Sequence, residues 1–229
     1  SMNNGLIDFT TKGFHLGDNI DINYSGSNFV SWSFKDTEGF FRVIKYTGNG
    51  TSGRTLTHDL GTTVGMVVIK KSNASDDWWT WHKDLSTSSW FKMNAEDGPS
   101  SSSFFSAAPT STTLTLTAND NVNGSGNEYM AYIFAHNDGD ASFGPTGDQD
   151  IIKCGSFTGN GSTQVIDLGF EPQWIFFRNT SDYRDNLIYD TMRGISMSGA
   201  DAQLQPWRNA SEGTINNLKV LSDGFKVNS

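Results

Sequence analysis

The stretch that decides the fold is "YTGNG" at residues 46–50, which returns as "FTGNG" at residues 157–161. The copies stand 111 residues apart (157 − 46) in a chain of 229 residues. Such a stretch could belong to a phosphate-binding loop, but neither copy continues into Gly-Lys-Ser or Gly-Lys-Thr and a helix. We therefore interpret it as a structural turn, in which Gly and Asn supply the positive φ angles of tight hairpins. The turn residues are Thr47, Gly48, Asn49 and Gly50 in the first copy and Thr158, Gly159, Asn160 and Gly161 in the second.

The sequence around the two turns also repeats. "HDLGTTVGMVVIKK" (58–71) matches "IDLGFEPQWIFFRN" (166–179) at an offset of 108 residues (166 − 58). A second block, "INYSGSNFVSWSF" (22–34), matches "VNGSGNEYMAYIF" (122–134) at an offset of 100 (122 − 22). The last residues, "LKVLSDGFKVNS", resemble "LIDFTTKGFHLG" near the start. Self-similarity of this size is typical of an array of domains.

Short β-branched or aromatic runs, such as "FRVIKY", "TLTLTA" and "QWIFF", are bounded by Gly, Asn, Asp or Ser and predict strands. We predict an all-β fold of two tandem antiparallel β-sandwich modules related by the internal repeat. The first sandwich spans 39–137, an acidic linker 138–149, and a second, truncated sandwich 150–229. Residues 1–38 carry strands of a partial module.

Two arrangements of the amino-terminal strands stay open. Residues 6–34 could complete the second sandwich, within one monomer or by exchange with a neighbour, since a sandwich that lacks a strand exposes an open edge. Alternatively, these strands pair with the first module and leave the second one short.

Composition excludes several classes of function. The net charge is −9 (16 − 25) and no cluster of Lys and Arg is visible, so nucleic acid is not an expected partner. No apolar run approaches the roughly 18–20 residues that cross a bilayer, so we expect no membrane insertion. The single cysteine, Cys154, rules out a disulfide framework, and its strand-like neighbours favour a small buried side chain over a nucleophile.

Five motifs in fixed order carry a family resemblance. They are "FFRVIKYTGNGTSGRTLTHDLGTTVGMVVIKK", "WWTWHKDL", "NVNGSGNEYMAYIFAHND", "DIIKCGSFTGNG" and "VIDLGFEPQWIFFRN". Together they resemble a repeat domain of unknown function found in virion structural proteins, described as tail fibre proteins, of marine bacteriophages. The resemblance implies a SPRY-like or concanavalin-like sandwich in a tail-associated fibre or spike, on the virion and outside the cell. It implies no catalytic residues. In the second copy "NLIYDTMRGI" replaces "WWTWHKDL", so a ligand that binds this segment would bind the first copy alone.

The aromatic segment "DDWWTWHKD" contains the candidate ligand-binding residues. Strand alternation places Trp79 and Trp81 on one face and Trp78 on the other, with Thr80 and His82. The repeat aligns the first pair with Leu187 and Tyr189, which marks their face as core, and it aligns Trp78 with Asn186, which indicates an exposed opposite face. The speculative glycan site predicted there consists of Trp78, Asp76, Asp77 and His82. The alternative is ordinary partial burial of Trp78 against a neighbouring strand or subunit.

An acidic insertion follows the second block, with Asp138, Asp140, Asp148 and Asp150. Clustered carboxylates can hold Ca²⁺, but the spacing fails the EF-hand pattern, and the four histidines stand at no metal-ligand spacing. We expect a solvated loop, no metal and no cofactor. No carboxylate pair suited to glycoside hydrolysis is visible either, since adjacent Asp residues on a strand point to opposite faces.

We expect a structural, adhesive module of a phage tail fibre or spike rather than an enzyme. Its expected partners are a host cell-surface glycan or protein and other virion subunits, with a homo-oligomer left open. The main alternative is a carbohydrate-binding module of a secreted bacterial enzyme. A polysaccharide depolymerase domain is a third hypothesis.

Overall fold

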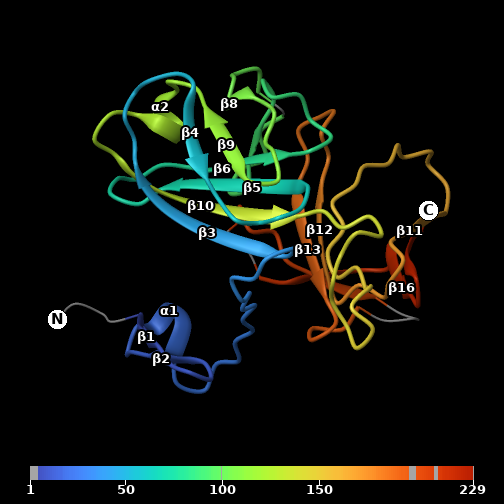
Figure 1. Ribbon diagram of the computed structural model, residues 1–229. Helices are drawn as coiled ribbons and strands as arrows, with labels where there is room; N and C mark the ends of the chain where they lie inside the picture. The colour runs from blue at the N-terminus through green and yellow to red at the C-terminus, as the bar shows by residue number, and fades with distance from the viewer. Residues whose placement is uncertain (1–4, 99, 196–199, 209–210, 229) are drawn as a thin grey trace. The chain divides into compact units, whose positions relative to one another are not determined.

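The computed structural model describes residues 5–98, 100–195, 200–208 and 211–228. These residues hold seventeen strands and two short helices, so the fold is all-β, and the strands pair antiparallel in several open sheets (Figure 1). The chain divides into two compact units, Ser1–Phe34 and Lys35–Ser229.

The amino-terminal unit consists of a hairpin, one helical turn and an extended segment. Its elements are β1 (Leu6–Phe9), β2 (Phe14–Leu16) and α1 (Ile20–Asn23). The side chain of Asn19 accepts a hydrogen bond from the Asp21 backbone N–H, which caps the helix. None of the described residues in this unit is buried. Nine large apolar side chains are exposed: Leu6, Ile7, Phe9, Leu16, Ile20, Tyr24, Phe29, Val30 and Phe34.

The first half of the larger unit contains two sheets. The five-stranded sheet has the order β3 (Phe41–Thr47), β10 (Glu128–Ala135), β5 (Val64–Lys71), β6 (Trp78–His82), β7 (Phe91–Lys92). The three-stranded sheet has the order β4 (Arg54–Thr57), β9 (Thr113–Leu116), β8 (Phe105–Ala107), and the helical turn α2 (Asp120–Asn123) leads into β10.

Side chains from both sheets form one hydrophobic core, and the alternation of β10 explains how. Tyr129, Ala131 and Ile133 point inward and are fully buried. They meet residues of β5 such as Ile69 and residues of β9 such as Leu116 in a single cluster. Strands with one face on a core show this period of two.

The second half forms smaller sheets. Its strands are β11 (Gln164–Asp167), β12 (Trp174–Arg178), β13 (Asn186–Asp190), β14 (Asp201–Gln203), β15 (Gly213–Ile215), β16 (Leu218–Leu221) and β17 (Gly224–Val227). They assemble as β11-β17-β16, β12-β13 and β14-β15, around a smaller core of Ile175, Tyr189, Leu218 and Phe225. These sheets do not confirm the predicted tandem arrangement of two sandwiches.

The hairpins β5–β6 and β12–β13 nevertheless share one register. Ile69 pairs with Trp79, and Phe177 pairs with Leu187, which lie 108 positions further on (69 + 108 and 79 + 108). The same offset links the ends of both hairpins. The sequence alignment of these two segments is therefore confirmed.

The glycine-rich turn is not the tight hairpin that we expected. Residues 47–50 lead from β3 in the five-stranded sheet to β4 in the three-stranded sheet, so the chain crosses between sheets. Only the last glycine of each copy has a positive φ, 66° at Gly50 and 70° at Gly161. By contrast, the loop predicted for residues 138–150 is confirmed, since residues 136–163 contain no helix or strand.

Candidate functional site

Strand β6 positions the three tryptophans of the aromatic segment. Trp79 and Trp81 are each 5% exposed, whereas Trp78 is 37% exposed, which confirms the predicted order. The ring of Trp79 meets the ring of Trp90 edge-on at 4.3 Å between centroids. Trp81 meets Phe105 in the same way at 5.5 Å. Both inward indoles therefore belong to the core.

The expectation that the whole opposite face of β6 is exposed was wrong, because Thr80 is fully buried there. Phe91 lies opposite Thr80 on β7. The ring of Phe176 stacks on Phe91 at 6.3 Å, and the Arg178 guanidinium lies 5.5 Å from the centre of the Phe91 ring. Hairpin β12–β13 thus covers this face of the sheet and leaves Trp78 accessible at one end.

Asn186, the repeat counterpart of Trp78, is also fully buried rather than exposed. Its Nδ2 group contacts the backbone carbonyls of Lys92, Met93 and Ala95 at 3.1, 2.7 and 3.0 Å. A buried amide is stable only with such partners. Asn186 therefore links the second half of the unit to the end of β7.

Beside Trp78 lies a shallow cavity of about 190 Å³, lined by Trp78, Met93, Asn94 and Pro206. The Trp78 ring stacks on Tyr132 at 6.0 Å, with 27° between the planes. Its backbone N–H donates to Asn94 Oδ1 at 2.9 Å. An indole held in place next to an amide is suited to a sugar ring, which offers an apolar face and hydroxyl groups.

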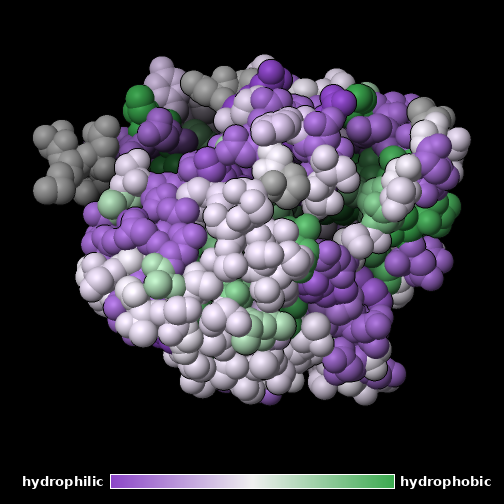
Figure 2. Space-filling view, turned by 90° about the horizontal axis from the view of Figure 1, so that it is seen from above, coloured by the Kyte–Doolittle hydropathy of each residue, from purple (hydrophilic) through white to green (hydrophobic). Residues whose placement is uncertain are grey.

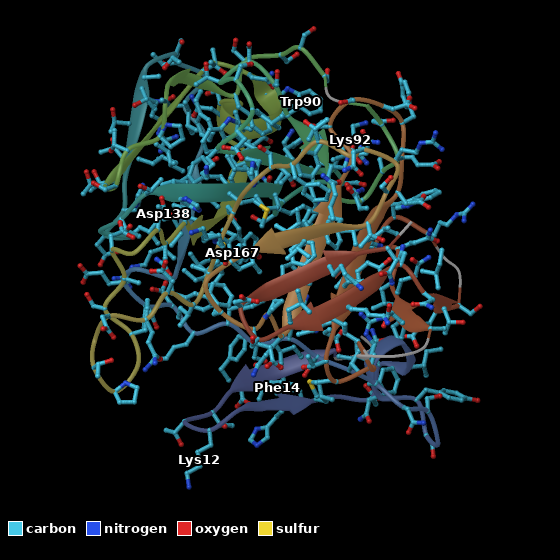
Figure 3. The ribbon with its side chains drawn as sticks, turned by 90° about the vertical axis from the view of Figure 1, so that its right-hand side faces the viewer. Lys12, Phe14, Trp90, Lys92, Asp138 and Asp167 are labelled. Carbon is cyan, nitrogen blue, oxygen red and sulfur yellow. The ribbon has the colours of Figure 1, made fainter. Side chains whose placement is uncertain are left out.

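Asp77 precedes Trp78 and contacts Asn94, one of the residues that line this cavity. Its carboxylate accepts from Asn94 Nδ2 at 3.0 Å and lies 3.1 Å from Lys92 Nζ. Lys92, which is labelled in Figure 3, also pairs with Asp97 at 2.7 Å, and this hydrogen bond raises the pKa of Lys92. Asp77 and Lys92 therefore bring hydrogen-bond acceptors and donors close to the cavity.

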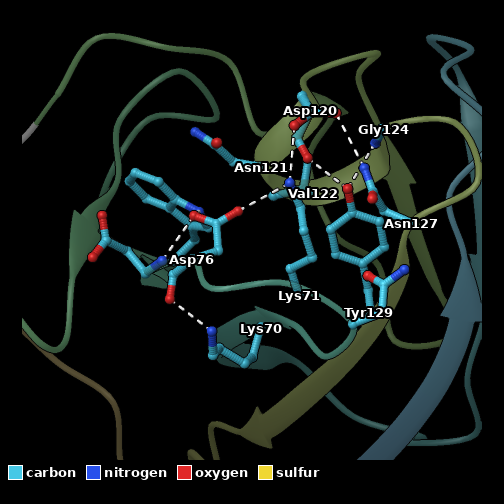
Figure 4. A network of polar contacts seen from close by, with 12 residues as sticks. Lys70, Lys71, Asp76, Asp120, Asn121, Val122, Gly124, Asn127 and Tyr129 are labelled. Atoms are coloured by element: carbon cyan, nitrogen blue, oxygen red, sulfur yellow. Dashed lines mark hydrogen bonds and ion pairs between the residues drawn. The ribbon is translucent and has the colours of Figure 1, made fainter.

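Asp76, although adjacent in sequence, belongs to a different network (Figure 4). Its carboxylate accepts from Trp79 Nε1 at 3.1 Å and lies 3.1 Å from Lys71 Nζ, which also contacts Asp120 at 2.9 Å. Burial alone would lower the pKa of Lys71, but the hydrogen bonds to Asp120 and Asp76 outweigh it and the net shift is upward. Asp76 thus pairs with the ammonium group of Lys71 and does not line the Trp78 cavity.

His82 lies at the other end of β6, four residues and roughly 13 Å along the strand from Trp78. Its Nδ1 accepts from the Asp84 backbone N–H at 3.2 Å, and burial lowers the pKa of the imidazole. Of the four predicted site residues, the structure therefore brings together Trp78 and Asp77 and separates Asp76 and His82.

Sequence reasoning missed the other lining residues. Met93 and Asn94 follow β7, and Pro206 lies in the second half. They are brought to Trp78 by tertiary packing and share no local pattern with it. Tyr132, which stacks on Trp78 and does not line the cavity, had a usable signal, since the alternation of β10 places it on the outward face.

Cys154 and the acidic loop residues make contacts of a different kind. Burial raises the pKa of the Cys154 thiol to about 12, and the thiol donates to the Ala135 carbonyl, so it is not a thiolate nucleophile at neutral pH. Asp138 pairs with Lys153 at 2.6 Å, while Asp150 accepts from a loop backbone N–H. No group of three His, Cys, Asp or Glu side chains in the described ranges could hold a metal ion.

On the face shown in Figure 2, hydrophilic and weakly polar side chains surround scattered hydrophobic patches. Across the part of the chain that the structure describes, no helix has the length and apolar character of a membrane span.

Comparison with known proteins assigns a family but no activity. The chain belongs to the family described as a domain of unknown function (DUF7483), whose model matches residues 1–229. Searches of curated proteins and of solved structures found no match.

Proposed function

We propose that the chain is a module of a bacteriophage virion structural protein, in a tail fibre or spike, which helps the virion attach to host cell-surface glycans. The proposal places it outside the cell, among other virion subunits, with no catalytic role. The five motifs quoted above support the phage assignment, and the internal repeat supports a modular fibre component.

The observation that carries the attachment role is the cavity beside Trp78. Aromatic side chains with an apolar body and a polar neighbour are enriched at binding surfaces. Trp78 has this character, since its indole is accessible while Asn94 and Asp77 stand beside it. The second half has no counterpart, because Asn186 occupies the equivalent position and is buried.

We propose further that the chain consists of two tandem SPRY-like or concanavalin-like sandwiches, residues 39–137 and 150–229, separated by the acidic linker 138–149. Residues 1–38 carry strands of a partial module. The shared hairpin register supports this arrangement. The sheet orders β4-β9-β8 and β11-β17-β16 support it as well. In each sheet, the strand that follows the glycine-rich turn (β4 or β11) pairs with the second strand of a later hairpin (β9 or β17).

The attachment proposal is tested on an array of bacterial surface polysaccharides. We expect binding to at least one polysaccharide, and a loss of affinity on the order of tenfold for Trp78→Ala, as for an interface hot spot above about 1 kcal/mol. Tyr183→Ala is the matched control, since Tyr183 is 71% exposed and does not line the cavity. No binding at all, or equal losses in both variants, would overturn the proposal.

The same cavity would serve a carbohydrate-binding module of a secreted bacterial enzyme. Neighbouring tail or capsid genes would favour the phage protein, and a neighbouring hydrolase domain would favour the alternative. Release of reducing sugar from a bound polysaccharide would instead indicate a depolymerase.

A further inference from the structure

The cavity beside Trp78 is smaller than a pocket that encloses a whole ligand. Its volume is about 190 Å³, whereas pockets for complete small molecules measure roughly 300–1,000 Å³. The cavity can therefore enclose one substituent of a ligand, while the rest of the ligand stays on the surface around it. The side chains that line the cavity decide which substituent fits.

The residues that line the cavity are uncharged. Trp78, Met93 and Pro206 contribute apolar side chains, and Asn94 contributes an amide. A carboxylate or ammonium group that entered the cavity would lose its hydration without an opposite charge in the lining, which is costly. A methyl group, by contrast, gains by leaving water. The substituent that fits is therefore neutral and largely apolar.

Asn94 keeps part of its hydrogen-bonding capacity for a ligand. Its Oδ1 accepts from the Trp78 backbone N–H at 2.9 Å, and its Nδ2 donates to the Asp77 carboxylate at 3.0 Å. A side-chain amide has two N–H donors, so one of them remains. Among the described residues, no group accepts this second N–H. The cavity thus combines apolar side chains with one N–H donor that a ligand oxygen can use.

Backbone hydrogen bonds fix the segments that carry these side chains. The Met93 N–H donates to the Trp78 carbonyl at 2.9 Å, and the Met93 carbonyl accepts from Asn186 Nδ2 at 2.7 Å. Two positions before the lining proline, Leu204 exchanges two backbone hydrogen bonds with Ile188, at 2.9 and 3.0 Å. A site that is ordered before binding loses less free energy when the ligand arrives.

The Trp78 indole offers a surface for the rest of the ligand. Its side chain is 37% exposed, and no described group accepts from its Nε1–H. A pyranose ring has an apolar face of C–H groups and hydroxyl groups at its edge. Such a ring can lie on the indole while one of its oxygens accepts from Nε1–H.

We propose that the cavity binds the acetamido group of an N-acetylated sugar, whose ring lies on the Trp78 indole. The methyl of this group contacts Met93 and Pro206, and its carbonyl oxygen accepts the second N–H of Asn94. A hydroxyl group lacks the methyl. The ammonium group of a free amino sugar carries a charge that the lining does not balance. The cavity therefore selects N-acetylated sugars over the parent hexoses and over free amino sugars.

This inference rests on the proposed attachment to glycans, because it names the class of sugar that the same cavity binds. The two proposals can fail separately. Binding on the polysaccharide array that Trp78→Ala weakens, without a preference for N-acetylated sugars, would overturn the acetamido site and support attachment. No binding on the array would overturn the attachment role, even where N-acetylated monosaccharides bind in solution.

The test is NMR of the full chain titrated with N-acetylglucosamine, N-acetylgalactosamine and N-acetylmannosamine, each compared with its parent hexose. The indole N–H resonance of Trp78 and the methyl resonance of Met93 report on the cavity. We expect at least one N-acetylhexosamine to shift both resonances. Its parent hexose should bind on the order of tenfold more weakly, which corresponds to about 1.4 kcal/mol. The free amino sugar, protonated at pH 6, should bind no better than the hexose.

Met93→Ala removes a side chain that contacts the acetamido methyl in the proposed complex. The ratio between the dissociation constants of the hexose and the N-acetylhexosamine, followed at the Trp78 indole, should therefore fall towards one. Met192→Ala is the matched control and should keep the ratio, since Met192 is 74% exposed and does not line the cavity.

Rhamnose and fucose carry a methyl group without an amide, so they should bind more weakly than the preferred N-acetylhexosamine. Three results would overturn the proposal. They are no shift with any of the three N-acetylhexosamines, equally tight binding of a parent hexose or a 6-deoxy sugar, and an unchanged ratio in Met93→Ala.

Discussion

Hairpins β5–β6 and β12–β13 share one register but have different surroundings. In the first, β5 is flanked by β10 as well as β6, and seven of its eight residues are buried. In the second, β12 belongs to a two-stranded sheet, and one of its five residues is buried. The repeat therefore sets which residues pair, whereas neighbouring strands decide how deeply the pair is buried.

Core truncation should show the largest difference between the halves. Trp79→Ala removes a side chain that is 5% exposed and packed against Trp90, and should lower the free energy of unfolding by about 3–5 kcal/mol. Its counterpart Leu187 is only half-buried, so Leu187→Ala should cost less than about 2 kcal/mol. Urea denaturation measures both. Equal losses of stability in the two variants would contradict a difference in burial between the two hairpins. Trp78→Ala is the control, because the Trp78 side chain is accessible to solvent.

The contact between the halves should give the next largest effect. Asn186→Ala removes the hydrogen-bond donor of three backbone carbonyls at the end of β7. It should lower the free energy of unfolding by about 1–3 kcal/mol. Asn216→Ala is the control, because this side chain is exposed and its contact with Asn228 is long, at 3.4 Å. If the two variants unfold at the same urea concentration, Asn186 does not hold the halves together.

The same comparison explains what the sequence could and could not predict. Strand alternation and the repeat were enough to place Trp79 and Trp81 in the core and to align the two hairpins, because both depend on local pattern. They failed for Thr80 and Asn186, because hairpin β12–β13 packs against β7 and the residues after it, which lie about a hundred residues earlier in the chain. The turn was misread for a similar reason. Gly48 is needed because a Cβ atom there would lie 2.1 Å from the carbonyl oxygen of Gly124, and not because a hairpin requires a glycine.

A change of pH should produce a smaller difference in stability between the two halves. His58, His82 and His136 lie in the first half, and burial lowers the pKa of each. The unfolded chain takes up protons near pH 6.5 while the folded chain stays neutral, so stability should fall as the pH drops below about 6.5. The second half contains no histidine.

Methyl NMR of Ile69 and Ile175 in urea at pH 7.5 and pH 5.5 measures this difference. The unfolding midpoint reported by Ile69 should fall at the lower pH by more than that reported by Ile175. Identical shifts at both residues would show that the two halves unfold as one, in spite of their different cores.

The smallest effect is expected in the loop between the halves, residues 138–150. Its carboxylates face different partners: Asp138 pairs with Lys153, which lowers the pKa of Asp138, and Asp140 accepts from Thr62 at 3.0 Å. A calcium ion needs six to eight converging oxygen ligands, and binding would raise the melting temperature by linkage. Melting curves in calcium and in chelator should therefore agree within about a degree. A rise of several degrees in calcium would mean that the loop rearranges around the ion and that the acidic segment is a metal site.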